Sequence, residues 1–185
     1  MNWRDLFQKG VRYDQFLERY GTAAERQRWR EVGRQVSLSA EQIRRLQMFR
    51  RQMHVLCLAG VWCGDCAEQC PILAAFASHC PQIDLRFLDR DEHPELSEYV
   101  SICGGKRVPV VIFLSEDDFL TGWYGDRTLA KYRQLAAQCD GAACPTGLVT
   151  DHELLAAVTD DWLDEFERHQ WILRTSPRLR SKHGD

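Results

Sequence analysis

Residues 55–66 read Val-Leu-Cys-Leu-Ala-Gly-Val-Trp-Cys-Gly-Asp-Cys, and this stretch decides the fold. Its opening run, Val55 to Ala59, is continuously apolar, which is typical of a strand buried on both faces of a sheet. Cys63 and Cys66 follow that strand and stand at the start of a helix expected over residues 64–78. The unpaired N–H groups and the dipole of a helix N-terminus stabilise a thiolate. The stretch therefore predicts a redox-active thiol pair.

Other interpretations of the Cys63–Cys66 spacing are weaker. A zinc site would normally need a second Cys-X-X-Cys or a suitably spaced histidine pair, and the sequence has neither. Adding Cys70 gives three thiols without an obvious fourth ligand. We therefore expect no metal and no other cofactor, and an unused buried pair is the remaining alternative.

Helices are expected on both sides of this region. Asn2 is predicted to cap a short turn through Phe7, and a helix over residues 13–20 is predicted to end at Gly21. Capping boxes predict helices that begin after Thr22, Ser39 and Thr150. The apolar stripes of the first two are expected to pack onto the main domain.

The remaining elements follow from apolar alternation and turn residues. Strands are expected over residues 55–59, 83–88, 110–114 and 119–124, and a short helix over 94–100. Asp126 is predicted to cap the next helix, and the polar tail from Ser176 is predicted to fray. This order of elements predicts an α/β domain with a mixed sheet.

At this point the sequence resembles the thioredoxin family. Trp62-Cys63-Gly64-Asp65-Cys66 matches the family's WCGPC motif in all but one position, Pro71 matches its helix-kinking proline, and Arg107-Val108-Pro109 its cis-proline segment. The resemblance covers residues 53–139. It implies a thioredoxin fold, a mixed central sheet flanked by helices, with a helical extension over 1–52 and a loop, a helix and a polar tail over 140–185.

The resemblance also implies a mechanism. Cys63 would attack a protein disulfide, and Cys66 would resolve the mixed disulfide that forms. Trp62 would shield the pair, and a cis Pro109 would leave the Val108 backbone free to pair with an extended substrate. The implied partners are protein disulfides and an electron donor such as a thioredoxin reductase. The alternative is a partner-binding or redox-sensing module with little catalysis.

Three departures from the family pattern concern charge and thiols. Asp65 replaces a proline, and its carboxylate is expected to raise the pKa of Cys63. Cys57 stands where the family has a buried aspartate, and Phe87 where it has the partner lysine. Cys70 lies one helical turn after Cys66; it and Cys57 are either small buried residues or thiols that exchange with the pair.

Composition and charge limit the classes of protein to which this chain can belong. The chain has 185 residues, of which 44% are apolar, as in an ordinary globular protein with a hydrophobic core. No stretch approaches the roughly 18 apolar residues of a membrane span, and no apolar signal region is visible, so we expect a cytoplasmic location without membrane contact. Residues 1–53 hold 12 basic against 6 acidic residues, yet no nucleic-acid motif accompanies them, so no nucleic-acid partner is expected. Cys139 and Cys144 could form a loop disulfide or a second redox switch, and otherwise are ordinary loop thiols.

Overall fold

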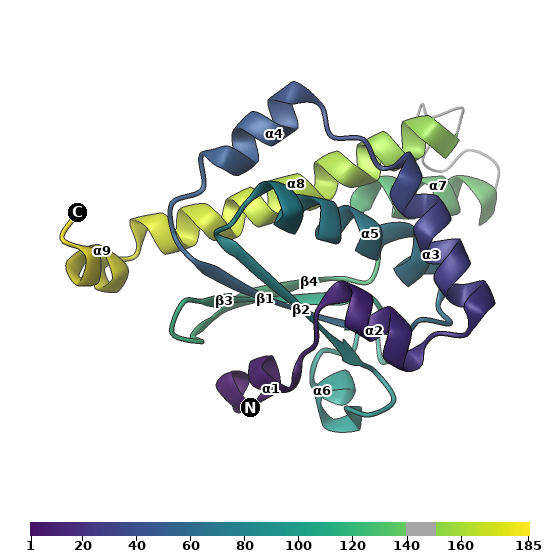
Figure 1. Ribbon diagram of the computed structural model, residues 1–185, viewed down its shortest axis with the longest axis horizontal. Coiled ribbons are helices and arrows are strands. Elements are labelled where there is room, and N and C mark those ends of the chain that lie inside the picture. Colours follow the sequence, from purple (N-terminus) through teal and green to yellow (C-terminus); the bar gives the residue numbers. More distant parts are fainter. Residues whose placement is uncertain (140–150) are drawn as a thin grey trace.

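The computed structural model describes residues 1–139 and 151–185, and its centre is a four-stranded mixed sheet (Figure 1). The strands are β1 (Met53–Ala59), β2 (Ile83–Asp89), β3 (Val110–Ser115) and β4 (Leu120–Gly125). Their order is β2-β1-β3-β4, with β1 parallel to β2 and antiparallel to β3. The predicted mixed sheet is therefore confirmed, and the apolar strand that carries Cys57 lies inside it.

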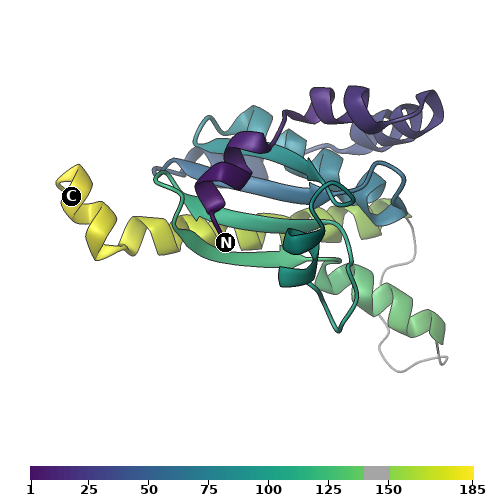
Figure 2. The same cartoon turned by 90° about the horizontal axis from the view of Figure 1, so that it is seen from below.

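Helices cover both faces of this sheet. On one side lie α3 (Ala23–Gln35), α4 (Ala40–Gln47), α5 (Gly64–His79) and α8 (Asp151–Thr175). On the other lie α1 (Trp3–Lys9) and α6 (Pro94–Tyr99), which Figure 2 shows in front of the strands. The remaining helices are α2 (Tyr13–Tyr20), beside β2, α7 (Leu129–Cys139), beside α8, and α9 (Pro177–His183).

The N-terminal helices pack on the main domain, as their apolar stripes predict. Phe16 and Trp29 are completely buried and contact each other, and Phe16 also lies against Phe87 of β2. The Trp29 indole donates a buried hydrogen bond of 2.9 Å to the carbonyl of Val61, which ties α3 to the loop before the reactive pair. Residues 1–52 thus share the core of the sheet.

Most predicted helix starts are confirmed, and one is wrong. Asn2, Thr22 and Ser39 each accept a backbone N–H at the start of their helices, while Thr150 lies outside the described residues. Asp126 does not cap α7. Its side chain is buried and accepts a hydrogen bond from Tyr132, whereas Thr128 precedes α7 and accepts the N–H of Lys131.

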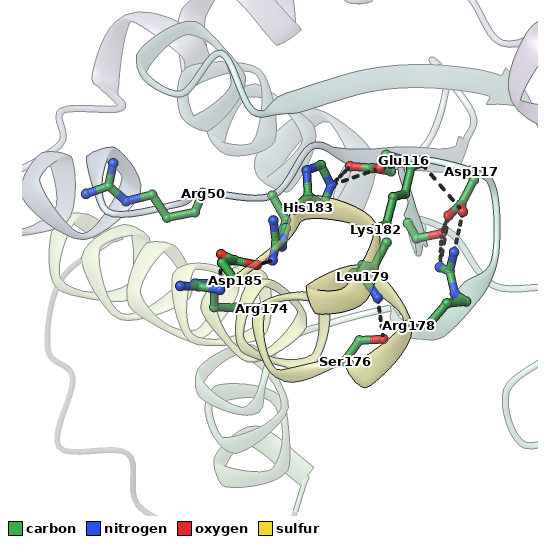
Figure 3. Close-up of polar contacts among 12 residues, drawn as sticks. Arg50, Glu116, Asp117, Arg174, Ser176, Arg178, Leu179, Lys182, His183 and Asp185 are labelled. Atoms are coloured by element: carbon green, nitrogen blue, oxygen red, sulfur yellow. Dashed lines mark hydrogen bonds and ion pairs between the residues drawn. The ribbon is translucent and has the colours of Figure 1, made fainter.

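The prediction that the tail from Ser176 frays is also wrong. Ser176 caps α9 by accepting the N–H of Leu179, whose side chain is only 1% exposed. The polar residues of α9 bind the β3–β4 turn: Arg178 pairs with Asp117, and Lys182 and His183 with Glu116 (Figure 3). Asp185 pairs with Arg174 and with the buried Arg51. Except for Arg174, these partners lie far away in the sequence. From the sequence alone, the polar tail therefore looked like a segment exposed to solvent.

None of the helices in residues 1–139 and 151–185 combines the length and the apolar character that a membrane span needs.

Candidate active site

Cys63 and Cys66 lie between the end of β1 and the first turn of α5. Cys63 is the N-cap residue of α5; its N–H donates to the carbonyl of Gly60 at 3.0 Å, and its carbonyl accepts the N–H of Ala67 at 3.0 Å. The Cys63 side chain is partly exposed and that of Cys66 is buried. Only the first of the two thiols is therefore accessible from outside the protein.

Three side chains and two glycines shape the surface beside Cys63 and Cys66. Trp62 is 46% exposed and lies across the backbone of Gly60, where a Cβ would stand 2.6 Å from the indole. The Arg90 guanidinium stacks over the Trp62 ring at 4.4 Å, a cation–π contact that fixes its position. Across the pair, a Cβ at Gly64 would lie 3.0 Å from Nη2 of Arg28. Glycine at residue 64 therefore lets Arg28 approach the start of α5.

The two thiols differ in how readily they lose a proton. The hydrogen bond with Cys66, together with burial, raises the pKa of Cys63. Burial opposes ionisation of Cys66, but hydrogen bonds from Cys63 and Cys70 outweigh it and lower the pKa of Cys66 to about 5. The pair thus loses one proton readily and holds the other.

Asp65 does not present a free carboxylate to the pair. Arg127 contacts it twice, with Nε 3.0 Å from one carboxylate oxygen and Nη2 2.7 Å from the other. Repulsion by Asp65 still raises the pKa of Cys63, but by less than hydrogen bonding and burial do. Arg127 lies 62 residues away in the chain, and no motif marked it in the sequence.

The cis-proline segment faces the exposed thiol. The Val108–Pro109 peptide bond is cis, as the resemblance implies. The Cys63 thiol donates a hydrogen bond of 3.5 Å to the carbonyl of Val108. The structure therefore brings Val108 and Pro109, which directly precede β3, beside Cys63.

Cys57 and Cys70 lie beneath the pair. Both are completely buried, and their sulfur atoms are 3.8 Å apart. Cys57 is paired in register with Phe87 of β2, the two positions where the family pattern has an acid and a lysine. In the part of the chain that the structure describes, no group of three or more His, Cys, Asp or Glu side chains is arranged to hold a metal ion. Cys139 and Cys144 lie at and beyond the edge of the described residues, so the structure does not address their pairing.

The sequence analysis did not identify Gln69, whose buried side-chain amide supports the start of α5. The Gln69 Nε2 donates to the carbonyl of Asp65 at 3.3 Å and to that of Asp126 at 3.0 Å. Its Oε1 accepts the indole N–H of Trp162 from α8 at 3.0 Å. A glutamine on the apolar face of a helix is the signal that could have found it, because buried polar groups need partners.

Together, the sheet order, the Cys-X-X-Cys at the first turn of the helix after β1 and the cis-proline beside it define a protein of the thioredoxin-fold class. A family model described as thioredoxin matches residues 10–137. The chain belongs to the thioredoxin family. The match includes α2, α3 and α4, which precede residues 53–139, the region that carries the sequence motifs of the family.

Solved structures agree on the fold. A protein of unknown function from Pseudomonas aeruginosa is 21% identical, with a TM-score of 0.67 over 89% of this chain and 98% of that chain. An HIV epitope scaffold is 20% identical, with the same TM-score and the same coverage of both chains. A search of curated proteins returned no match. At these identities the two structures support the fold alone.

Proposed function

We propose that this protein is a thiol–disulfide oxidoreductase that reduces or exchanges protein disulfides. The observation that carries the proposal is the arrangement at Cys63, a partly exposed thiol at the first turn of α5, with the cis-proline segment 3.5 Å away. Cys63 acts as the nucleophile and Cys66 as the resolving thiol.

The reaction has two exchange steps. The Cys63 thiolate attacks one sulfur of a substrate disulfide, and the other substrate sulfur leaves with the electron pair and takes a proton from solvent. Cys66, as a thiolate, then attacks the sulfur of Cys63, and the second substrate sulfur leaves in the same way. The substrate has gained two electrons and the protein holds a Cys63–Cys66 disulfide, which an electron donor such as a thioredoxin reductase would reduce.

Substrate binding would use the surface beside Cys63. An extended peptide can pair with the backbone of Val108, because a cis-proline follows it and directs no N–H toward the thiols. The exposed ring of Trp62, held by Arg90, offers an apolar surface next to this segment. Together these features fit an extended polypeptide better than a small molecule.

A disulfide-reduction assay with insulin and dithiothreitol tests the proposal. We expect activity from the wild type and none from Cys63→Ser, whereas Cys66→Ser should accumulate a mixed disulfide with substrate. Cys103→Ser is the matched control, because Cys103 is exposed and lies outside the site. An inactive wild type would contradict the proposal and favour the alternative, a partner-binding or redox-sensing module.

A further inference from the structure

Gln69 places a polar side chain on the buried face of α5, where the residue is only 1% exposed. Its Nε2 donates hydrogen bonds to the backbone carbonyls of Asp65, at 3.3 Å, and Asp126, at 3.0 Å. Its Oε1 accepts the indole N–H of Trp162 at 3.0 Å. Because carbonyls only accept and an indole N–H only donates, these three partners allow the amide a single orientation. The amide therefore joins three segments of the chain in a fixed arrangement.

Two of these segments carry the parts of the candidate active site. Asp65 stands in the first turn of α5, directly before Cys66. Asp126 follows Gly125, the last residue of β4. A Cβ at Gly125 would stand 2.4 Å from the carbonyl oxygen of Pro109, so this end of β4 packs directly on the cis-proline. The amide thus bridges the start of α5 and the strand end that supports the cis-proline segment.

The gap that this bridge spans is the one across which a substrate would bind. The Cys63 thiol lies on one side, and the carbonyl of Val108 lies on the other, at 3.5 Å from the sulfur. The two residues belong to different segments of the chain, so no local backbone geometry fixes the distance between them. A displacement of roughly 1 Å between reacting groups can slow an enzyme by about a hundredfold. Contacts that fix this distance therefore matter for the reaction.

We propose that Gln69 is a positioning residue that holds the first turn of α5 against the cis-proline segment, so that one substrate can engage both. This role rests on the proposed function and deepens it. An extended peptide would pair with the backbone of Val108 while its disulfide meets Cys63. Gln69 exchanges no proton and forms no bond to the substrate; it acts through the carbonyls of Asp65 and Asp126.

Trp162 of α8 sets the orientation of the amide. The indole is completely buried, and its ring lies edge-on to Tyr124 of β4 with the centroids 5.2 Å apart. A buried indole N–H needs an acceptor, and Oε1 of Gln69 provides it. Both hydrogens of Nε2 are then left for the two carbonyls. In this way α8, which lies outside residues 53–139, takes part in shaping the site.

Two reactions of Cys63 separate this role from a general loss of stability. Alkylation by iodoacetamide needs only the accessible thiolate, whereas insulin reduction needs the thiol and the Val108 backbone together. Gln69→Leu removes both donors at nearly the same side-chain volume. We expect its kcat/KM for insulin to fall about tenfold, with most of the change in KM. Alkylation of Cys63 should stay within about twofold of the wild-type rate, because the thiolate itself is unchanged.

Three further variants test the amide and its surroundings. Gln69→Met also removes the donors, and it serves the test should the leucine variant fail to fold. Trp162→Phe leaves the amide its donors but frees its orientation, so kcat/KM should fall by less than in Gln69→Leu. Thr159→Val is the matched control, because its buried hydroxyl donates to the carbonyl of Leu155 within α8. It should leave kcat/KM unchanged, and urea unfolding of every variant measures the stability that is lost.

Three results would overturn the role of Gln69. One is an unchanged kcat/KM in both Gln69→Leu and Gln69→Met, because the ion pairs of Arg127 with Asp65 and Asp126 would then suffice. Another is an alkylation rate that falls as much as kcat/KM, because the defect would lie in the thiol. The third is an equal fall of kcat/KM in Thr159→Val.

These results leave the proposed function standing. A wild type that reduces no insulin would instead overturn the proposed function and the role of Gln69 with it, so the two failures are distinguishable.

Discussion

Arg127 holds the carboxylate of Asp65, one of the two residues between Cys63 and Cys66, through contacts to both of its oxygens. The same guanidinium lies 3.7 Å from the buried Asp126, and Asp126 lies 3.4 Å from Arg107. Arg107 stands two residues before Pro109. A line of alternating charges therefore connects the Cys-X-X-Cys loop to the cis-proline segment, and it offsets the negative charge of Asp65 at the thiols.

Removing Arg127 should slow the reaction of the pair with alkylating agents. In Arg127→Ala the charge of Asp65 is no longer compensated, so a thiolate next to it is less stable. We expect alkylation of Cys63 by iodoacetamide at neutral pH to be roughly two- to fivefold slower. This change corresponds to the free energy that a partly exposed ion pair contributes. Asp65→Asn should speed it up, and the double variant should resemble Asp65→Asn. Equal rates in Arg127→Ala and wild type would contradict the compensation.

The Trp29–Val61 hydrogen bond should stabilise the whole domain. Trp29→Phe keeps an aromatic ring but leaves the buried carbonyl of Val61 without its donor. We expect a loss of about 1–3 kcal/mol in the free energy of unfolding, measured with urea. Trp171→Phe is the control, because the exposed Trp171 indole bonds only to Glu167 on its own helix and should cost less than about 0.5 kcal/mol. Equal losses in the two variants, or a separate transition for the N-terminal helices, would argue against this coupling.

His169 should make the protein less stable in mild acid. It stacks on Phe113 with the ring centroids 4.0 Å apart, and burial lowers its pKa to about 4. In the unfolded chain a histidine titrates near 6.5. As the pH falls from about 6.5 to about 4, the unfolded state takes up a proton that the folded state does not, so stability falls by up to about 3 kcal/mol.

Replacing His169 with phenylalanine should remove this pH dependence. Urea midpoints of His169→Phe should change less between neutral pH and pH of about 4 than those of the wild type. His79→Gln, at an exposed histidine, is the matched control and should keep the wild-type dependence. If the urea midpoint of His169→Phe depends on pH as strongly as that of the wild type, other titrating groups cause the effect.

The Arg178–Asp117 pair should contribute stability that strong acid removes. Hydrogen bonding to Arg178 lowers the pKa of Asp117 to about 2. A lowered carboxyl pKa stabilises the folded state above the usual value near 3.9, and this contribution is lost as the pH falls through about 2. The Tm difference between wild type and Arg178→Met should therefore be largest near neutral pH and should disappear once the pH falls below about 2. Arg133→Met, on the exposed face of α7, should show no such convergence.

The sequence predicted the elements that carry strong local signals. The apolar run from Val55 to Ala59 needs a buried strand, and the capping boxes at Thr22 and Ser39 satisfy free N–H groups within one helical turn. The position of the Val108–Pro109 bond beside Cys63 was predicted from the family resemblance, because the spacing of these residues alone does not indicate it. Such features depend on neighbours in the chain or on a pattern shared by the family.

The features that were missed depend on long-range partners. Asp126 has the chemistry of a helix cap, but Tyr132 and Arg107 bind its carboxylate, so Thr128 takes the position before α7. Arg178 looks like a solvated residue in a polar tail until the β3–β4 turn brings Asp117 to it. A single sequence does not reveal which charges from distant segments will meet, because exposed and paired charges follow the same local pattern.

Gly125, at the end of β4, lies outside every motif that the sequence displays. Its φ of +153° is one that side chains rarely adopt, and a Cβ there would stand 2.4 Å from the carbonyl oxygen of Pro109. Any other residue would push the cis-proline segment away from its place beside Cys63. In a library that samples all amino acids at every position, residue 125 should accept glycine alone, as strictly as the cysteines themselves.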